Sequence, residues 1–238
     1  MNYVPLSWAF FASLWFLFAM VVVLVEIGLL RYVFETLGVS QRYMLLLLVC
    51  SLLGSYVNIP VAQLPPEYIR SGEIVRVFGT SYVVPVVRER SGPVLAVNLG
   101  GAVIPVILSI YLIFKSGEFF NCFMAIILVS YLVHRMARPV PGVGIVVPTF
   151  IPPLITAVVA LLLSRRHAPA LAYVAGSIGT LVGADLLNLK KVIGMGAPIA
   201  SIGGAGKFDG IFLTGIVAML LAGVIGGFRH RAAAETWL

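Results

Sequence analysis

Residues 169–189 read PALAYVAGSIGTLVGADLLNL, an apolar run in which Asp185 is the one charged residue. A helix needs about 20 mostly apolar residues to cross a bilayer, and this run has that length. We therefore predict a membrane-spanning helix over 169–189. An ionised carboxylate is costly in hydrocarbon, so an acid within such a helix is a candidate functional residue.

The rest of the chain has the same character. Of its 238 residues, 61% are hydrophobic and 11% are charged, whereas a soluble domain has about 25% charged residues. We predict an all-α polytopic membrane protein of about seven transmembrane helices, which form a single membrane domain over 1–238. The predicted spans are 7–30, 43–61, 98–115, 119–134, 143–164, 169–189 and 208–228.

The formal net charge of +7 does not indicate nucleic-acid binding, because basic residues of membrane proteins gather in loops and set the orientation. With the N-terminus inside the cell, nine of the 16 Lys and Arg residues would lie in the cytoplasm and seven outside. This small excess favours that orientation. We expect membrane lipids as partners and no nucleic acid.

The region 62–97 differs from the predicted spans. Short segments rich in Val and Ile are separated by Gly-Thr and Ser-Gly, a pattern typical of strands joined by tight turns. Because open strand edges cannot face lipid, we predict a small β-hairpin region between the second and third spans. It would lie at the membrane surface as a cap over the helices, or line a cavity within the protein.

Two pairs of similar segments predict an internal duplication. VNLGGAVIPVILSIYLI at 97–113 resembles ASIGGAGKFDGIFLTGI at 200–216, and SLLGSYVNIPV at 51–61 resembles TLVGADLLNLKKV at 180–192. The predicted repeat halves are 7–115 and 143–228, with 119–134 as a linker helix. Aspartates occur only in the second half, so we interpret them as a specialisation of that half.

The two aspartates, Asp185 and Asp209, end the predicted sixth span and begin the seventh. Antiparallel neighbouring helices would bring both carboxyl groups to the same depth. Two carboxylates in one low-dielectric site cannot both ionise readily, so one keeps its proton. Such a pair suits peptide hydrolysis, in which the ionised acid activates water and the protonated acid donates to the carbonyl oxygen. In the alternative interpretation Asp185 is tied to Asn188 or Lys190, and Asp209 to Lys207 or to exposed amides.

The connector 194–210 is rich in glycine, which lets a backbone approach a ligand closely and adopt positive φ. Asn98 and Asn188 either cap helices or orient a substrate backbone. The candidate substrate-binding residues within the connector are Gly203, Gly204, Gly206 and Lys207.

Gly176, Gly179 and Gly183 form a small-residue face that leads toward Asp185. This face is either part of a substrate path or a surface for close helix packing. The two interpretations are compatible.

The order of these features resembles that of the GxGD intramembrane aspartyl proteases, the group of presenilin, signal peptide peptidase and prepilin peptidase. In the presenilin-like branch one catalytic aspartate lies late in the sixth helix, and the other follows glycines at the start of the seventh. The resemblance covers about 170–226 and implies that Asp185 and Asp209 are catalytic. The chain differs in having Ala184 before the first aspartate, and Lys207 and Phe208 before the second.

The Pro-Ala-Leu motif of that family has its nearest counterparts in Pro152-Pro153-Leu154 of the fifth span and Ala197-Pro198 of the connector. By this resemblance Pro152 and Pro153 are candidate substrate-binding residues. The segments GADLLNL and SIGGAGKFDGIFLTG also resemble those of an uncharacterised family of prokaryotic multipass proteins. This second resemblance implies a prokaryotic cytoplasmic membrane as the location.

We therefore expect an intramembrane aspartyl endopeptidase that cleaves transmembrane or membrane-associated peptides. An extended substrate would pair with the β-segments at 73–97 or 197–203 by strand addition. The alternative is an ion- or proton-coupled secondary transporter that uses the same acids, since broken helices hold ions in such proteins. A membrane scaffold or lipid-binding protein is a third class. The sequence has no nucleotide loop, haem spacing or zinc spacing, so we predict no cofactor and no metal.

Overall fold

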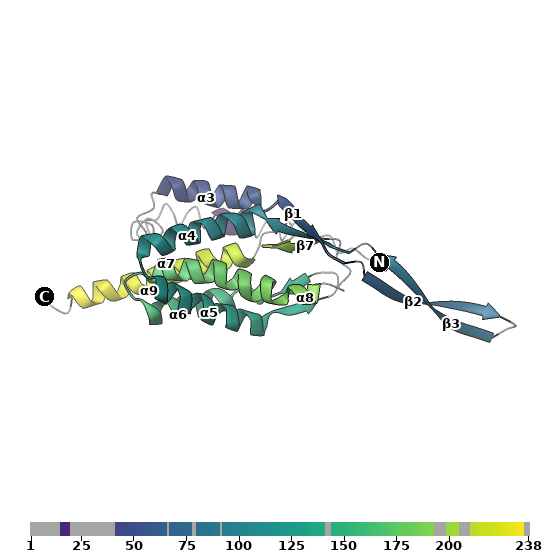
Figure 1. The fold of residues 1–238 in the computed structure, drawn as a ribbon. Coiled ribbons are helices and arrows are strands. Elements are labelled where there is room, and N and C mark those ends of the chain that lie inside the picture. Colours follow the sequence, from purple (N-terminus) through teal and green to yellow (C-terminus); the bar gives the residue numbers. More distant parts are fainter. Residues whose placement is uncertain are drawn as a thin grey trace.

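The computed structural model describes residues 15–19, 41–65, 67–77, 80–90, 92–140, 144–192, 199–204 and 210–235. Its helices lie side by side along one direction as a bundle. A long hairpin projects from one end, and the C-terminal helix extends beyond the other (Figure 1). Of the first predicted span, 7–30, only a helical segment at 15–19 falls within the described residues.

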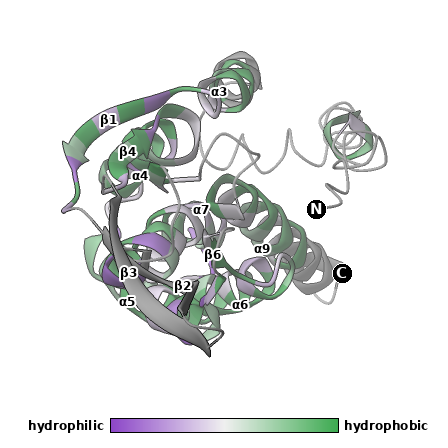
Figure 2. Ribbon diagram, turned by 90° about the vertical axis from the view of Figure 1, so that its right-hand side faces the viewer, coloured by the Kyte–Doolittle hydropathy of each residue, from purple (hydrophilic) through white to green (hydrophobic). Residues whose placement is uncertain are grey.

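In the described part of the chain, the bundle consists of α3 (Gln41–Gly54), α4 (Ile104–Ser116), α5 (Phe119–Met136), α6 (Ile151–Leu163), α7 (Ala168–Val174) and α9 (Gly210–Glu235). Seen from the end, α7 lies in the middle, with α4, α5, α6 and α9 around it (Figure 2). Helix α3 lies at the periphery and contacts α4. The predicted sixth span is therefore the centre of the fold.

Among the described residues, three helical segments are long and apolar enough to cross a membrane: Leu99–Ser116, Phe119–Met136 and Ala168–Lys191. They confirm helices at the predicted spans 98–115, 119–134 and 169–189. The same part of the chain also has shorter apolar helices at Ile151–Leu163 and Gly210–Gly226. The structure thus supports a polytopic membrane protein, and the total of seven spans stays a prediction.

The span predicted over 43–61 is too long. Helix α3 ends at Gly54, and β1 (Asn58–Gln63) follows it. Pro60 has no N–H to donate within a helix, and it lies opposite Ala96 in an antiparallel strand pair. Strand pairing therefore replaces the last helical turns.

The span predicted over 143–164 is also too long, because α6 begins only at Ile151. The segment before it contains β6 (Gly144–Val146), which pairs with β5 (Arg138–Val140). Pro148 disfavours helical backbone in the residue before it, and α6 begins only after a bend at Thr149 and Phe150, with prolines in its first turn.

A three-stranded sheet lies at one end of the bundle. Its strand order is β1, β4 (Val94–Asn98) and β7 (Ile199–Ile202). Strands β1 and β4 are antiparallel, whereas β4 and β7 are parallel. β4 runs directly into a π-turn, η1 (Leu99–Val103), and then into α4. The fold therefore combines helices with a mixed sheet, which the all-α prediction did not include.

Strands β2 (Glu67–Val77) and β3 (Thr80–Arg90) form an antiparallel hairpin. The hairpin continues the β1–β4 pair away from the bundle (Figure 1). Strands are thus found within the predicted β-rich region 62–97. They are longer than the sequence pattern indicated.

The central span is not a regular α-helix. After α7 the chain continues through the π-turns η2 (Ala175–Gly179) and η3 (Leu181–Asp185), the 3-10 turn η4 (Leu186–Asn188) and the short α8 (Leu189–Val192). Ala175 and Ala184 lie in one buried cluster with residues of α5. In an α-helix nine residues make about two and a half turns, which would put these two alanines on opposite faces. The wider winding brings them to the same face.

Glycines let neighbouring helices pack against this span at backbone distance. A Cβ on Gly176 would lie 2.8 Å from the Cα of Gly215 in α9, and one on Gly179 would lie 2.9 Å from Cγ1 of Val129 in α5. A Cβ on Gly183 would collide with the backbone of Ser130. Helices in lipid associate by such small-residue contacts rather than by the hydrophobic effect. Close packing therefore accounts for the predicted small-residue face.

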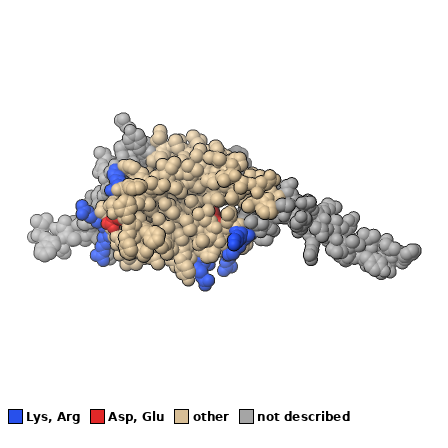
Figure 3. All heavy atoms as spheres, in the orientation of Figure 1, with Lys and Arg blue, Asp and Glu red and all other residues tan. Residues whose placement is uncertain are grey.

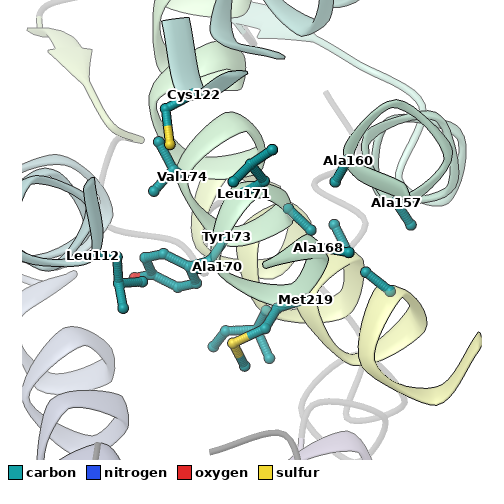
Figure 4. Close-up of a cluster of buried hydrophobic side chains, with 14 of the residues drawn as sticks. Leu112, Cys122, Ala157, Ala160, Ala168, Ala170, Leu171, Tyr173, Val174 and Met219 are labelled. Carbon is teal, nitrogen blue, oxygen red and sulfur yellow. The ribbon is translucent and has the colours of Figure 1, made fainter. Parts of the chain in front are cut away.

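The largest buried cluster surrounds α7 (Figure 4). Tyr173, Leu171 and Val174 point outward from this helix toward its neighbours. Ala157 and Ala160 on α6 are fully buried, which lets α6 approach closely.

On the face seen in Figure 3, the charged side chains of the described residues gather toward the two ends of the bundle, and uncharged atoms cover the belt between them. We call these the Asp185 end, which also carries the sheet, and the Glu118 end. Exposed basic residues of the Asp185 end are Arg135, Arg138, Lys190 and Lys191, and those of the Glu118 end are Lys115, Arg165 and Arg166. This distribution is typical of a protein surrounded by lipid.

Candidate functional site

Asp185 is the last residue of η3, at the end of the central span. Its carboxylate oxygen Oδ2 accepts a hydrogen bond of 2.7 Å from the backbone N–H of Gly203. The partner of the acid is therefore a backbone amide of the glycine-rich connector. In the described residues it is not the side chain of Asn188 or Lys190, which the alternative interpretation named.

The turn at Gly203 and Gly204 fits this contact. Both residues have positive φ, +87° and +91°, in a region that is open to glycine and strained for other residues. A Cβ on Gly203 would lie 2.7 Å from the Cβ of Ala102. Glycine is thus required by the backbone conformation and again by the close approach of η1.

A small apolar cluster holds the same region together. Ala102 of η1, Leu181 of η3 and Ile211 of α9 are buried in one cluster, and Ile202 of β7 packs against it. Leu181 precedes Asp185 by one turn of η3, and Ile211 is the second residue of α9. The start of α9 therefore lies against the turn that carries Asp185.

Polar side chains connect all three strands of the sheet. Asn58 Oδ1 accepts hydrogen bonds from Ser201 Oγ at 2.7 Å and from Asn98 Nδ2 at 3.0 Å. Asn58 belongs to β1, Asn98 to β4 and Ser201 to β7. Since β7 leads directly into Gly203, this network helps to place the N–H that contacts Asp185.

Asn98 is 1% exposed and caps the π-turn η1. Its Oδ1 accepts from the N–H of Gly101 at 2.8 Å, and its Nδ2 donates to the carbonyl of Ser55 at 2.6 Å. Of the two roles predicted for Asn98, the structure supports the helix cap.

Asn188 is fully buried at the end of the central span. Its Nδ2 donates to the carbonyl oxygens of Gly183 and Ala184 at 3.0 and 2.9 Å, and lies 3.1 Å from Nδ1 of His134. Its Oδ1 accepts from Nζ of Lys191 at 2.8 Å. This side chain caps the π-turn η3, and its polar atoms are occupied within the protein.

The other predicted site residues fall into two groups. Asp209, Gly206 and Lys207 lie outside the described residues. Pro152 and Pro153 are buried in the first turn of α6, where the missing N–H of proline costs no helical hydrogen bond. No contact described in the structure joins these two prolines to Asp185.

Asn58, Ala102 and Ser201 were not among the predicted site residues. The sequence signal that could have found Ala102 is the repeated Gly-Gly-Ala motif, because Gly203 of the second copy packs on Gly101 and Ala102 of the first. No comparable signal marks Asn58 or Ser201, which meet only through the pairing of distant strands.

A family model described as "Protein of unknown function (DUF1614)" matches residues 52–221, more than two thirds of the chain. No curated protein and no solved structure matches the chain. The matched range includes the sheet, the central span and the start of α9.

Proposed function

This chain belongs to the DUF1614 family of proteins of unknown function, and we propose that it is an intramembrane aspartyl protease. Asp185 and Asp209 form the proposed catalytic pair, and the substrate is a transmembrane or membrane-associated peptide. The observation that carries the proposal is the hydrogen bond from Gly203 to Asp185. It attaches an acid of the central span to the segment that leads, six residues later, to the other aspartate.

The proposed chemistry needs one ionised and one protonated carboxyl group, which two nearby acids at low dielectric adopt. The ionised group takes a proton from water while the water oxygen forms a bond to the peptide carbonyl carbon. The protonated group donates its proton to the carbonyl oxygen. The C–N bond then breaks, its electron pair stays on nitrogen, and nitrogen takes a proton from the pair. One hydroxyl of the intermediate re-forms the C=O bond and returns its proton to the pair, which is thereby restored to one ionised and one protonated group. The products are a carboxylic acid and an amine.

The described segments on either side of residue 209 support this pairing. Before it, Gly203 contacts the carboxylate of Asp185. After it, Ile211 is buried with Leu181 in the cluster beside the same turn. We propose that the connector brings Asp209 to Asp185 between these two fixed points.

The edge of the sheet supports a binding mode for the substrate. β7 pairs with β4 on one side, and in the described part of the chain no strand pairs with its other side. An unpaired strand edge can bind an extended peptide through main-chain hydrogen bonds. A peptide on this edge would run toward the Gly203 turn and Asp185, and Gly204, Gly206 and Lys207 are proposed to contact its backbone.

The alternative function is an ion- or proton-coupled secondary transporter. It is favoured by two parallel strands, β4 and β7, each followed by a glycine pair and then by a helix. This arrangement supports the proposed duplication of 7–115 and 143–228. Transporters built from repeats bind ions where helices are interrupted, and the π-turns beside Asp185 interrupt the central span.

Proteoliposomes that contain the full-length protein and a reporter peptide with one transmembrane segment test the proposal. We expect cleavage that is lost in Asp185→Asn and in Asp209→Asn, and that is blocked by a transition-state mimic of peptide hydrolysis. Glu118→Gln, a matched change from acid to amide at the opposite end of the bundle, should leave cleavage unchanged. Ion flux that depends on Asp185, with no cleavage, would overturn the protease and support the transporter.

A further inference from the structure

The exposed basic residues of the Asp185 end come from elements that one buried side chain joins. They lie in the last turn of α5, at the start of β5 and in α8, and are Arg135, Arg138, Lys190 and Lys191. Nδ2 of Asn188 lies 3.1 Å from Nδ1 of His134 in α5, and Oδ1 of Asn188 accepts a hydrogen bond of 2.8 Å from Nζ of Lys191. These contacts hold the C-terminal end of α5 beside α8, and the basic side chains of this end gather on the face seen in Figure 3.

These basic side chains have no described counter-ion. In the part of the chain that the structure describes, no carboxylate forms an ion pair with any of the four. The acid of this end, Asp185, accepts a hydrogen bond from the N–H of Gly203. The Glu118 end differs, because the loop that carries Arg165 and Arg166 also contacts the carboxylate of Glu118. Like charges that share one surface repel each other, so a bound anion would stabilise the Asp185 end.

Exposed apolar side chains lie next to the charges on both elements. On α5, Tyr131 and Leu128 precede Arg135 by four and seven residues, a spacing that puts all three on one face of the helix. Tyr131 and Leu128 are 61% and 43% exposed. Leu187 precedes Lys190 by three residues and is 55% exposed. We call these five residues the Arg135–Lys190 surface. Since α5 is long and apolar enough to cross a membrane, this surface joins a charged end to the apolar belt.

We propose that the Arg135–Lys190 surface binds an anionic phospholipid, with the phosphate at its two basic side chains and the acyl chains along its apolar residues. Basic clusters between helices at the membrane surface attract anionic headgroups. The guanidinium of arginine offers paired N–H donors that match the oxygens of a phosphate. A soluble anion would neutralise the charges and leave the apolar residues uncovered, whereas a lipid covers both. The inference goes beyond the proposed proteolysis and does not depend on it.

The bound headgroup would also fasten the end of the central span. Asn188 caps η3, which ends at Asp185, and its side chain contacts both α5 and α8. A phosphate shared by Arg135 and Lys190 adds a second link between the same two elements. The lipid would therefore hold the turn that carries the acid against α5.

Native mass spectrometry of the full-length protein in detergent micelles tests the site. The probes are phosphatidylglycerol and phosphatidylcholine with identical acyl chains. We expect phosphatidylglycerol to bind about tenfold more tightly or better, because each basic residue near the headgroup adds to the attraction. The double variant Arg135→Gln/Lys190→Gln should lose most of this preference. Arg165→Gln/Arg166→Gln, which removes the same charge from two exposed residues of the Glu118 end, should keep it.

Equal affinity for the two lipids, or equal losses in the two double variants, would overturn the proposal. Displacement of the lipid by an equal concentration of glycerol 3-phosphate would overturn it too, because a free phosphate would then be the ligand. A dimer that only Arg135→Gln/Lys190→Gln disrupts would identify a second copy of the chain as the occupant instead.

If that double variant does not fold, the salt dependence of the unsubstituted protein decides. Raising ammonium acetate from about 50 to about 500 mM should weaken phosphatidylglycerol binding severalfold, because salt screens the charges. Binding of phosphatidylcholine should change little. An affinity for phosphatidylglycerol that salt leaves unchanged would refute the site.

Discussion

At Gly203 three requirements meet in one residue. The backbone has φ +87°, the neighbouring Ala102 leaves no space for a side chain, and the N–H donates to Asp185. The sequence predicts that glycines in this connector let the backbone approach another group closely. It does not say which group, because Ala102 is about a hundred residues away in the chain.

We expect Gly203→Ala to lower the free energy of unfolding by about 1–3 kcal/mol more than Gly117→Ala does, through steric overlap with Ala102. Gly117 also has positive φ, +67°, but no atom lies within 4 Å of the site of its Cβ. The Gly117→Ala variant therefore measures the backbone strain alone, which costs about 1–2 kcal/mol. Reversible unfolding in mixed micelles measures both variants. Equal losses would show that the contact with Ala102 imposes no constraint.

Glu118, before α5, connects the α4–α5 and α6–α7 loops. Its Oε1 lies 2.8 Å from Nδ1 of His167 and accepts from Ser164 Oγ at 3.0 Å, and its Oε2 accepts from Asn121. The hydrogen bond with His167, followed by that with Asn121, holds the pKa of Glu118 below its ordinary value of 4.5. The folded state therefore favours the ionised carboxylate.

This stabilisation is fully present above pH 4.5 and is lost as the pH falls through the lower pKa of the folded protein. We expect the unfolding free energy of Glu118→Gln to depend less on pH below 4.5 than that of the unsubstituted protein, because glutamine does not titrate. Unfolding titrations between about pH 3 and 6 measure the difference. Parallel curves for the two proteins would contradict the assignment.

The winding of the central span decides which of its residues share a face. Its π-turns place Ala175 and Ala184 on one face against α5 and end at Asp185. The apolar run at 169–189 predicts a spanning helix, but a helical pattern of 3.6 residues per turn does not reveal a π-turn. The π-turns are recognised only in the folded structure, in which neighbouring helices pack on this span.

We expect Gly183→Ala to destabilise the protein by about 1–3 kcal/mol, because its Cβ would overlap the backbone of Ser130, which cannot move as a side chain can. Gly226→Ala in α9 is the control, since nothing lies within 4 Å of the site of its Cβ. Alanine favours a helix over glycine by about 1 kcal/mol, so the control should be neutral or stabilising. The same unfolding assay compares them, and similar values would refute close packing at Gly183.

The cap of η1 provides a second prediction for an element. Asn98→Ala leaves the N–H of Gly101 and the carbonyl of Ser55 without their side-chain partner in a buried site. We expect a loss of about 1–3 kcal/mol in unfolding free energy. Asn121→Ala, which removes a part-buried bond to Glu118, should cost less. A smaller loss at Asn98 than at Asn121 would argue against the capping role.

For the whole molecule, the sheet links the projecting hairpin to the candidate site. The β2–β3 hairpin continues β1 and β4, β4 pairs with β7, and β7 leads to the N–H that holds Asp185. The two strands of the hairpin, β2 and β3, contact each other extensively. We infer that the hairpin is not needed for the bundle to fold.

Deletion of residues 67–90 tests this inference, because the β1–β4 pair closes independently at Gln63 and Val94. We expect the unfolding free energy of the bundle to change by no more than about 0.5 kcal/mol, as for surface changes away from the core. Thermal unfolding followed by circular dichroism measures this. A loss several times larger would show that the hairpin supports the bundle.

The sequence alone determined the class of the protein and the helices at its core. Long apolar runs must satisfy their own backbone in lipid, so composition and length predicted helices at 98–115, 119–134 and 169–189, and the structure has helical segments at Leu99–Ser116, Phe119–Met136 and Ala168–Lys191. The acid at 185 was conspicuous for the same reason. Boundaries failed at 43–61 and 143–164, where proline and strand partners outweighed apolar length.

Only the tertiary structure decided which groups meet at Asp185. Its hydrogen bond to Gly203 and the contact of Gly203 with Ala102 both join segments that are distant in sequence. A hydropathy pattern averages the preference of residues for lipid or water over a stretch of sequence. A site depends on directional contacts between particular atoms, and these exist only once the strands and helices have packed.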